Sequence, residues 1–429
     1  QAYEQAKGAS RQEFLRQAAR IGGVYVPSLY NTEYNDDGTV AATMPVHESA
    51  RRVVVRRVMQ DLPPPVVKPV VPFIEIVHDR AVIEIQRGCT RGCRFCQAGM
   101  IYRPSRERPK ALVLEAIDSL LANTGYDEIG LLSLSTNDYT EIEDLVQELA
   151  ARHPGVRIGL PSLRMDSFSV GLAKAVERRK AGLTFAPEAG TQRLRDVINK
   201  GITDDDIRGA VETAFQEGWR AIKLYFMIGL PTETLEDVEG IASLLRQTMG
   251  AGRRYAGRRA EISATISTFI PKAHTPFQWC PQDGEESIRT KQDLLRRSAR
   301  GMRLSWSDTR SSQLEALLSR GDRRLAPVIH RAWELGCKFD AWSDRLRFDT
   351  WQQALDECGL SLAFYTERER YADEVFSWDH ISSGVTKRFF RREYERSVPG
   401  DLTADCRHAD CAACGMAALH PGCVRGVSQ

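Results

Sequence analysis

The 429-residue sequence lacks any long hydrophobic run and has almost no net charge. No apolar stretch approaches the roughly 20 residues that a membrane-spanning helix needs, so we expect no membrane contact. The formal net charge is only +2 at pH 7, so whole-chain electrostatics do not demand a nucleic-acid partner. A signal peptide is also missing, and most of the ten cysteines fall into two clusters with metal-like spacing. Together these features favour the cytoplasm, where thiols stay reduced.

An initiator methionine is missing too, because the chain begins with Gln1 inside a helix-like stretch. We therefore expect a fragment whose N-terminal domain is absent. Residues 1–79 are interpreted as a connector. Its elements are a helix over 11–21, strand-like pieces over 23–29 and 51–58, and the proline-fixed linker "DLPPPVVKPVVP".

From residue 80 onward, short apolar strands alternate with amphipathic helices, which is typical of parallel βαβ units. The sequence predicts an α/β protein whose core, over residues 80–285, is a partial (β/α)6 TIM-like barrel. A helical C-terminal region over 286–400 and a cysteine-rich tail over 401–429 are expected to follow. The predicted barrel strands cover residues 81–86, 128–134, 157–163, 182–186, 221–228 and 261–269. The predicted helices cover residues 110–123, 141–152, 169–179, 192–198, 204–217, 234–249, 288–301, 312–319, 323–335 and 350–358.

Three cysteines follow the first predicted strand of the barrel. Cys89, Cys93 and Cys96 have C-x3-C-x2-C spacing, which can hold three irons of a [4Fe–4S] cluster and leave the fourth iron open. The alternatives are a zinc knuckle or a chance pattern. Zinc prefers four ligands in paired short spacings, and no fourth ligand follows Cys96 closely.

This motif resembles that of the radical S-adenosylmethionine (SAM) superfamily. The resemblance implies the partial barrel fold, an open iron chelated by SAM, and Phe95 beside the adenine. The later stretch "FAPEAGTQRLRDVINKG" is similar to one in methylthiotransferase-like members. There, the position of Glu188 binds SAM and that of Lys200 pairs with the SAM carboxylate. A lysine in place of the family's arginine turns a bidentate clamp into a point charge.

Other candidate SAM-binding residues lie at strand ends. Thr136, in "SLSTNDY", is a candidate for the SAM ammonium group, or a helix cap. Arg164 is a candidate contact for SAM or a substrate anion, or the partner of a structural salt bridge. Gly229, in "GLPTET", resembles a loop that approaches the adenine in this superfamily.

The tail holds a second cysteine group. Cys406, Cys411 and Cys414 have C-x4-C-x2-C spacing, and Cys423 follows. Four thiolates can close an auxiliary Fe–S cluster or a zinc site. We favour Fe–S and expect this site to bind its metal independently of the barrel. The alternative is a disordered tail with reduced thiols.

Taken together, the motifs resemble one bacterial family of radical SAM proteins with an N-terminal cobalamin-binding-like domain. The resemblance implies reductive cleavage of SAM to a 5′-deoxyadenosyl radical, used for methylation or methylthiolation of RNA or protein. It also implies cobalamin bound by the missing domain and a reductant protein of the flavodoxin or ferredoxin type. A different hypothesis is a non-catalytic Fe–S protein that binds RNA or a ribosome-linked partner through basic runs such as "KRFFRREYER". A zinc protein is the third.

Overall fold

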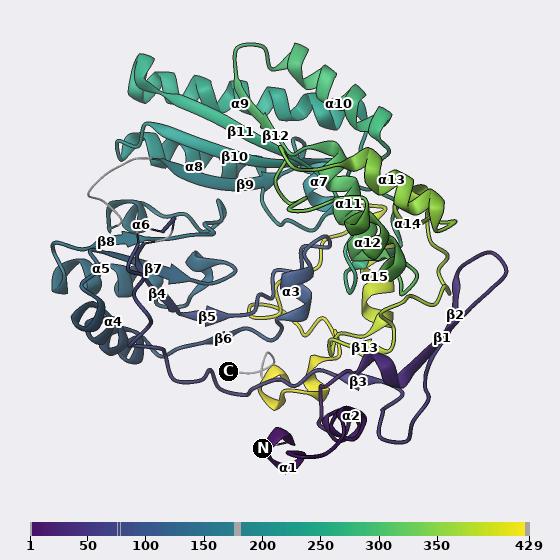
Figure 1. Cartoon of the computed structure of the whole chain (residues 1–429). Coiled ribbons are helices and arrows are strands. Elements are labelled where there is room, and N and C mark those ends of the chain that lie inside the picture. The colour runs from purple at the N-terminus through teal and green to yellow at the C-terminus, as the bar shows by residue number, and fades with distance from the viewer. Residues whose placement is uncertain (1, 75, 78, 176–181, 425–429) are drawn as a thin grey trace.

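The barrel strands of this computed structural model form two parallel sheets (Figure 1). The structure describes residues 2–74, 76–77, 79–175 and 182–424. A three-stranded sheet has the order β4-β7-β8, and a four-stranded sheet has the order β12-β11-β10-β9. Their bounds are β4 (Ala81–Glu84), β7 (Glu128–Leu132), β8 (Arg157–Gly159), β9 (Leu183–Glu188), β10 (Ala221–Ile228), β11 (Glu261–Thr268) and β12 (Arg303–Trp306).

Helices connect these strands and cover their outer sides, with α4 and α5 along the smaller sheet and α8, α9 and α10 along the larger (Figure 1). The bounds are α4 (Lys110–Thr124), α5 (Ile142–Arg152), α6 (Val170–Ala175), α7 (Gln192–Val197), α8 (Asp204–Gln216), α9 (Leu235–Ala256) and α10 (Glu285–Ser298). Thr203 caps α8 and Thr234 caps α9, each in a capping box with an aspartate three residues later. Such boxes satisfy two otherwise unpaired backbone N–H groups, which fixes where each helix starts.

The α/β class and the partial barrel predicted from the sequence are confirmed, and each of the six predicted strands is present. The strands form no closed barrel, because β8 and β9 border different sheets. The predicted helix over 169–179 is seen as α6, and its last residues lie outside the described part of the chain. Among the strands that the sequence did not predict, β12 pairs in parallel with β11, so the sheet continues into a region predicted to be helical.

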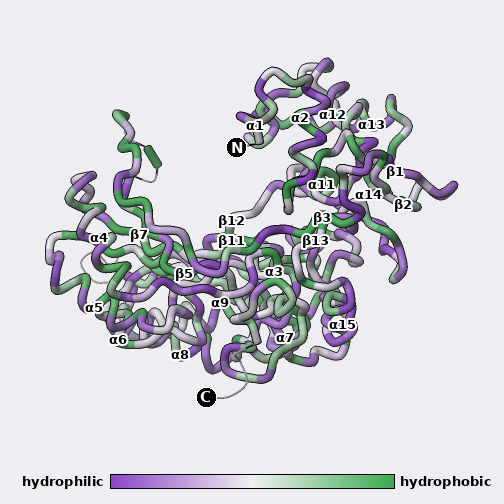
Figure 2. Tube along the Cα trace, turned by 90° about the horizontal axis from the view of Figure 1, so that it is seen from below, coloured by the Kyte–Doolittle hydropathy of each residue, from purple (hydrophilic) through white to green (hydrophobic). Residues whose placement is uncertain are grey.

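Of the remaining helices, α11, α12, α13 and α14 gather with the N-terminal hairpin, apart from the barrel strands, whereas α15 lies beside α7 (Figure 2). Their bounds are α11 (Thr309–Arg320), α12 (Leu325–Glu334), α13 (Phe348–Glu357), α14 (Leu362–Thr366) and α15 (Lys387–Ser397). The N-terminal part contains α1 (Ala2–Gln5), α2 (Arg11–Ala19), β1 (Tyr30–Tyr34), β2 (Val40–Pro45) and β3 (Val54–Val55), the last paired with β13 (Ile381–Ser382).

The strand predicted over 23–29 is wrong. That segment is irregular and ends in a 3-10 turn, Pro27–Leu29, whereas β1 and β2 form an antiparallel hairpin further on. Its turn is built at Asn35 and Gly38, where the Gly38 N–H donates to the Asn35 carbonyl and Gly38 has φ +81°. Glycine suits such a left-handed position because it has no Cβ.

The short elements around the cysteine loop complete the architecture. They are β5 (Gln86–Arg87), β6 (Arg106–Glu107), which pairs with β5, and α3 (Gln97–Ile101). In Figure 1 the tail, drawn in yellow, returns to the barrel and passes beside α3. Across the described residues, no helix combines the length and apolar character that a bilayer-crossing segment needs.

Candidate SAM and iron–sulfur site

The loop between β5 and α3 carries the three cysteines of the C-x3-C-x2-C motif. Cys89, Cys93 and Cys96 are all half-buried free thiols. Cys96 is the N-cap of α3, and its Sγ accepts a hydrogen bond from the Gly99 N–H at 3.2 Å. This hydrogen bond lowers the pKa of the Cys96 thiol, an effect that burial outweighs.

The three thiols lie close enough to interact electrostatically. Burial, followed by the effect of Cys93, raises the pKa of the Cys96 thiol to about 12. Burial and Cys93 also raise the pKa of Cys89. Two cations act in the opposite direction, since Arg164 lowers the pKa of Cys89 and Lys200 lowers that of Cys96. The loop is thus a group of crowded thiols with positive charge beside it.

This donor set fits a [4Fe–4S] cluster with one open iron, because three thiolates bind three different irons. Across the described residues, no three His, Cys, Asp or Glu side chains converge as the ligands of a single metal ion do. In a cubic cluster each thiolate binds its own iron, so the ligands surround a larger volume than those of one ion.

Three of the predicted SAM-binding residues lie together beside the loop. The Lys200 Nζ donates to the Glu188 Oε1 at 3.0 Å and lies 6.0 Å from the centre of the Phe95 ring. Phe95 comes from the cysteine loop and Glu188 from the end of β9, so the contact joins segments far apart in sequence. SAM is an amino acid attached to an adenosine. A carboxylate can bind its amino group, an ammonium can bind its carboxylate, and an aromatic ring can pack against its adenine.

Arg164 joins the same group. Its Nη2 donates to the Lys200 carbonyl at 2.7 Å, and its Nε donates to the Asp166 Oδ1 at 3.0 Å. The side-chain amide of Asn137 bonds to both the carbonyl and the N–H of Arg164, at 2.8 and 2.9 Å. The salt bridge to Asp166 considered from the sequence is therefore present, while the guanidinium also faces the cysteines.

Strained backbone gathers at the carboxyl ends of the strands. Ser162 after β8, Glu188 at the end of β9, Thr232 after β10 and His274 after β11 have φ values of +62°, +70°, +62° and +56°. A side-chain-bearing residue in this conformation costs about 1–3 kcal/mol and persists only where its surroundings enforce it. Ligand sites of α/β barrels lie at this same edge of the sheet, so the strain marks the candidate site independently of the cysteines.

Two predicted residues have other roles in the structure. Thr136 is fully buried, and its hydroxyl donates to the Pro161 carbonyl, so it ties the loop after β7 to the segment after β8. Gly229 adopts φ +84°, and its N–H donates to the Glu233 Oε1 at 2.7 Å. The hydrogen-bond donors of Thr136 and Gly229 are therefore used within the protein.

Sequence reasoning missed polar residues inside the cysteine motif itself. Arg91 pairs with Asp138 and with Asp166, the latter at 2.9 Å. Arg94 is fully buried and donates to the Val197 carbonyl at 3.0 Å. The Asn199 amide donates to the carbonyls of Arg91 and Gly92. In the sequence these residues were marked only by their position within "CTRGCRFC" and "NKG". Local spacing does not show that their hydrogen-bond and ion-pair partners come from distant segments.

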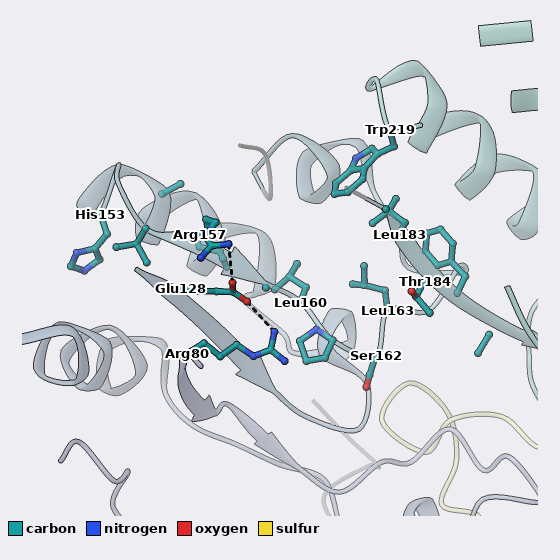
Figure 3. Close-up of a pocket in the computed structure, with 18 of the residues that line it drawn as sticks. Arg80, Glu128, His153, Arg157, Leu160, Ser162, Leu163, Leu183, Thr184 and Trp219 are labelled. Carbon is teal, nitrogen blue, oxygen red and sulfur yellow. Dashed lines mark hydrogen bonds and ion pairs between the residues drawn. The ribbon is translucent and has the colours of Figure 1, made fainter. Parts of the chain in front are cut away.

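A large cavity lies away from the cysteines, between the two sheets (Figure 3). Its volume is about 910 Å³, and β8 and β9 form its walls. At one end, Glu128 bridges Arg80 and Arg157 at 3.0 and 3.3 Å. None of the seven predicted cysteine ligands is among the described residues that line it. The cavity is therefore separate from the cysteine loop of the candidate SAM site.

The basic run at residues 387–396 forms most of α15, and two of its three aromatic residues are buried. Phe389 and Phe390 are each 2% exposed and pack in a cluster with Trp279 and Met100. These two buried rings are unavailable for base stacking, and the RNA-binding hypothesis, which rested on the basic runs as a whole, stays a prediction.

Comparisons with known proteins agree with this geometry. The fold combines parallel βα units with a three-cysteine loop at the strand ends, the arrangement expected of an iron–sulfur enzyme of the barrel type. Residues 83–245 match the Radical SAM superfamily, and this segment of the chain belongs to that superfamily of enzymes. The predicted superfamily is confirmed.

Several relatives are similar over part of their length. An uncharacterised protein of Methanocaldococcus jannaschii is 34% identical over 58% of this chain and 53% of its own length. A tRNA-2-methylthio-N(6)-dimethylallyladenosine synthase of Chlorobium phaeobacteroides is 27% identical over 38% of this chain and 39% of its own. The chain thus spans about half the length of these relatives, or less.

Among solved structures, one similar chain is a radical S-adenosylmethionine methyltransferase, TsrM, of Kitasatospora setae, with cobalamin and a [4Fe–4S] cluster bound. Its TM-score is 0.42 at 15% identity, and the match covers 65% of this chain and 61% of that one. A TM-score and an identity this low support no inference about the activity or cofactors of the present chain.

Proposed function

We propose that this chain uses a [4Fe–4S] cluster on Cys89, Cys93 and Cys96 to cleave SAM reductively. When bound, the cluster supplies one electron that breaks the 5′ carbon–sulfur bond of SAM, giving methionine and a 5′-deoxyadenosyl radical. The observation that carries the proposal is the contact of Lys200 with both Glu188 and Phe95, next to the cysteine loop.

Different residues of the chain bind different parts of SAM. Glu188 accepts hydrogen bonds from the SAM amino group, and Lys200 pairs with the SAM carboxylate. Phe95 lies against the adenine. Arg164, held by Asn137 and Asp166, keeps a positive charge beside the thiolates. Since these residues already contact one another, the binding groups are positioned before SAM arrives, which limits the entropic cost of binding.

For the fate of the radical, we propose methylation or methylthiolation of RNA or protein. The support is the similarity to a tRNA methylthiolating synthase and to a ribosomal protein uS12 methylthiotransferase of Desulfotalea psychrophila, the latter 28% identical over 39% of this chain. The proposal includes cytoplasmic location and an electron donor of the flavodoxin or ferredoxin type. Cobalamin would serve methylation, and a metal on the tail cysteines would serve as a second centre.

The test is SAM cleavage by the chain purified and reconstituted without oxygen. With dithionite as reductant, we expect 5′-deoxyadenosine and methionine in equal amounts, measured by liquid chromatography. Cys93→Ala should give none, and Cys358→Ala, at the end of α13 and outside the loop, should match the wild type. Absence of 5′-deoxyadenosine from a chain that holds its iron would overturn the proposed function.

The substrate class needs a second comparison. Mass spectrometry of tRNA, ribosomal RNA and ribosomal proteins from cells with and without the intact gene should show one methyl or methylthio group lost. Identical modification patterns in the two would exclude RNA and ribosomal protein as substrates.

A further inference from the structure

The four tail cysteines form one group of thiols. Burial, followed by the effects of Cys414, Cys406 and Cys411, raises the pKa of Cys423 to about 11. Cys406 interacts in turn with Cys414 and Cys411. Cys414 is only 6% exposed, whereas Cys411 lies at the surface. Cys414 and Cys423 also pack in the same apolar cluster, so packing as well as electrostatics brings these thiols together, with Cys411 exposed to solvent.

The backbone around Cys414 is held in a tight turn. Ala413 has φ +50° and Gly415 has φ +104°. The Thr386 N–H donates to the Cys414 carbonyl at 2.9 Å, and a Cβ on Gly415 would meet the Thr386 Cγ2 at 2.7 Å. An alanine held at positive φ is unfavourable, so this turn is imposed by its surroundings.

The first tail cysteine is attached to the barrel on both sides. Asp405 pairs with Arg91 at 3.6 Å, and the Arg407 Nη1 donates to the Asp138 carbonyl at 2.8 Å. Cys406 lies between these two residues in sequence. Arg91 belongs to the C-x3-C-x2-C loop, so a single ion pair links the residue before Cys406 to the loop of the barrel cysteines.

Residues just before the tail cysteines bond to the same loop. The Asn199 amide donates to the Thr403 carbonyl at 3.1 Å and accepts from the Thr403 N–H at 2.8 Å, while also bonding to the Gly92 carbonyl. The Arg94 Nη2 donates to the Asp401 carbonyl at 2.5 Å. The tail segment therefore contacts the cysteine loop of the barrel, while its independent binding of a metal stays a prediction.

Segment 401–407 has no helix or strand to hold it in place. Its position depends on these side-chain bonds and on whatever fixes Cys406. Thiolate–metal bonds are strong enough to order an otherwise irregular segment, and four thiolates complete the coordination of an Fe–S cluster without an open site.

We propose that Cys406, Cys411, Cys414 and Cys423 bind one Fe–S cluster, and that this centre clamps segment 401–407 onto the barrel's cysteine loop. This inference deepens the proposed function, since the clamped loop is the one that holds the SAM-cleaving cluster. Loss of the tail centre should loosen residues 89–94 although they contain none of its ligands.

The test uses the full chain purified without oxygen, with Cys411→Ser as the main variant because Cys411 is exposed and its replacement should not disturb packing. Iron and sulfide should fall by one cluster per chain, while the barrel cluster remains visible by electron paramagnetic resonance after reduction. Hydrogen exchange at 89–94 and at 401–407 should rise together by about tenfold or more, the size expected for loss of one charged hydrogen bond. Cys358→Ser, in the helical region, is the matched control and should change neither.

A second variant separates clamping from metal binding. Asp405→Ala keeps all four cysteines, so it should keep the full iron content yet raise exchange at 89–94. Unchanged iron in Cys411→Ser would overturn the tail centre, and zinc in place of iron would overturn its assignment as Fe–S. Unchanged exchange at 89–94 in both variants would overturn the clamp. If the wild type fails to cleave SAM, the proposed function is overturned. The iron content and the hydrogen exchange of the two variants would still test the tail centre and the clamp.

Discussion

The two cysteine groups differ in what surrounds them. The loop group follows β5, and charged residues from distant strand ends face it, among them Arg164 and Lys200. In the tail group, Cys414 and Cys423 pack in an apolar cluster that includes Met416 and Phe389, and Arg103 lowers the pKa of Cys406. Three thiols beside paired charges suit a small zwitterion bound at an open iron, whereas four thiols on an apolar base suit a closed centre. Similar spacing thus leads to two different chemical settings.

The largest effect should come from the loop group. Cys93→Ala removes one of only three ligands, and the tail cysteines are engaged elsewhere, so the barrel cluster and SAM cleavage should be abolished. Iron analysis and 5′-deoxyadenosine formation measure this, with Cys358→Ala as control. Near-normal 5′-deoxyadenosine formation by Cys93→Ala would contradict the assignment of the loop as the SAM-cleaving site. The loop and the tail could then no longer be distinguished as an open and a closed metal centre.

The next effect concerns the link between the two regions. Arg94 and Glu393 form a buried ion pair at 3.4 Å, which joins the cysteine loop to α15 beneath the tail. Removing one partner of such a pair leaves an uncompensated buried charge, so Arg94→Ala should lower the free energy of unfolding by about 3–5 kcal/mol. Urea denaturation measures this loss.

Two further variants control this measurement. Arg208→Ala removes an exposed pair with Asp205 on α8 and should cost less than about 1 kcal/mol. Adding Glu393→Gln to Arg94→Ala should restore part of the stability, because it removes the unpaired charge. A loss as small as that of Arg208→Ala would mean that the two regions are not coupled through this pair.

A smaller effect is expected at the SAM-binding residues. Glu188→Ala removes one charged hydrogen bond to the SAM amino group, which should cost about 1.5–3 kcal/mol, or roughly ten- to hundredfold in SAM affinity. Calorimetry on the reconstituted protein measures the affinity, and the iron content should stay unchanged. Glu236→Ala, at the exposed start of α9, is the control. If SAM affinity is the same in both variants, Glu188 lies outside the site.

The sequence predicts what depends on local pattern, and it misses what depends on distant partners. The six strands and the cysteine loop were visible because apolar alternation and short spacing are local signals. The strand β12 was hidden because it is a four-residue edge strand whose exposed positions hold Arg303 and Ser305. The bonds from Asn199 to Thr403 and from Arg94 to Asp401 join residues some two hundred or more positions apart. No periodicity reports such contacts, so the docking of the tail could not be predicted.

The smallest effect separates a buried structural residue from a ligand-binding one. Thr136→Val keeps the shape of the side chain but removes the hydrogen bond to the Pro161 carbonyl, so it should lower the free energy of unfolding by about 1 kcal/mol. SAM affinity should not change, because the hydroxyl is fully buried and already donates within the protein. Thr140→Val, at an exposed position nearby, should change neither stability nor affinity. If Thr136→Val weakened SAM binding tenfold while Thr140→Val did not, Thr136 would return to the site, as its place at the end of β7 first suggested.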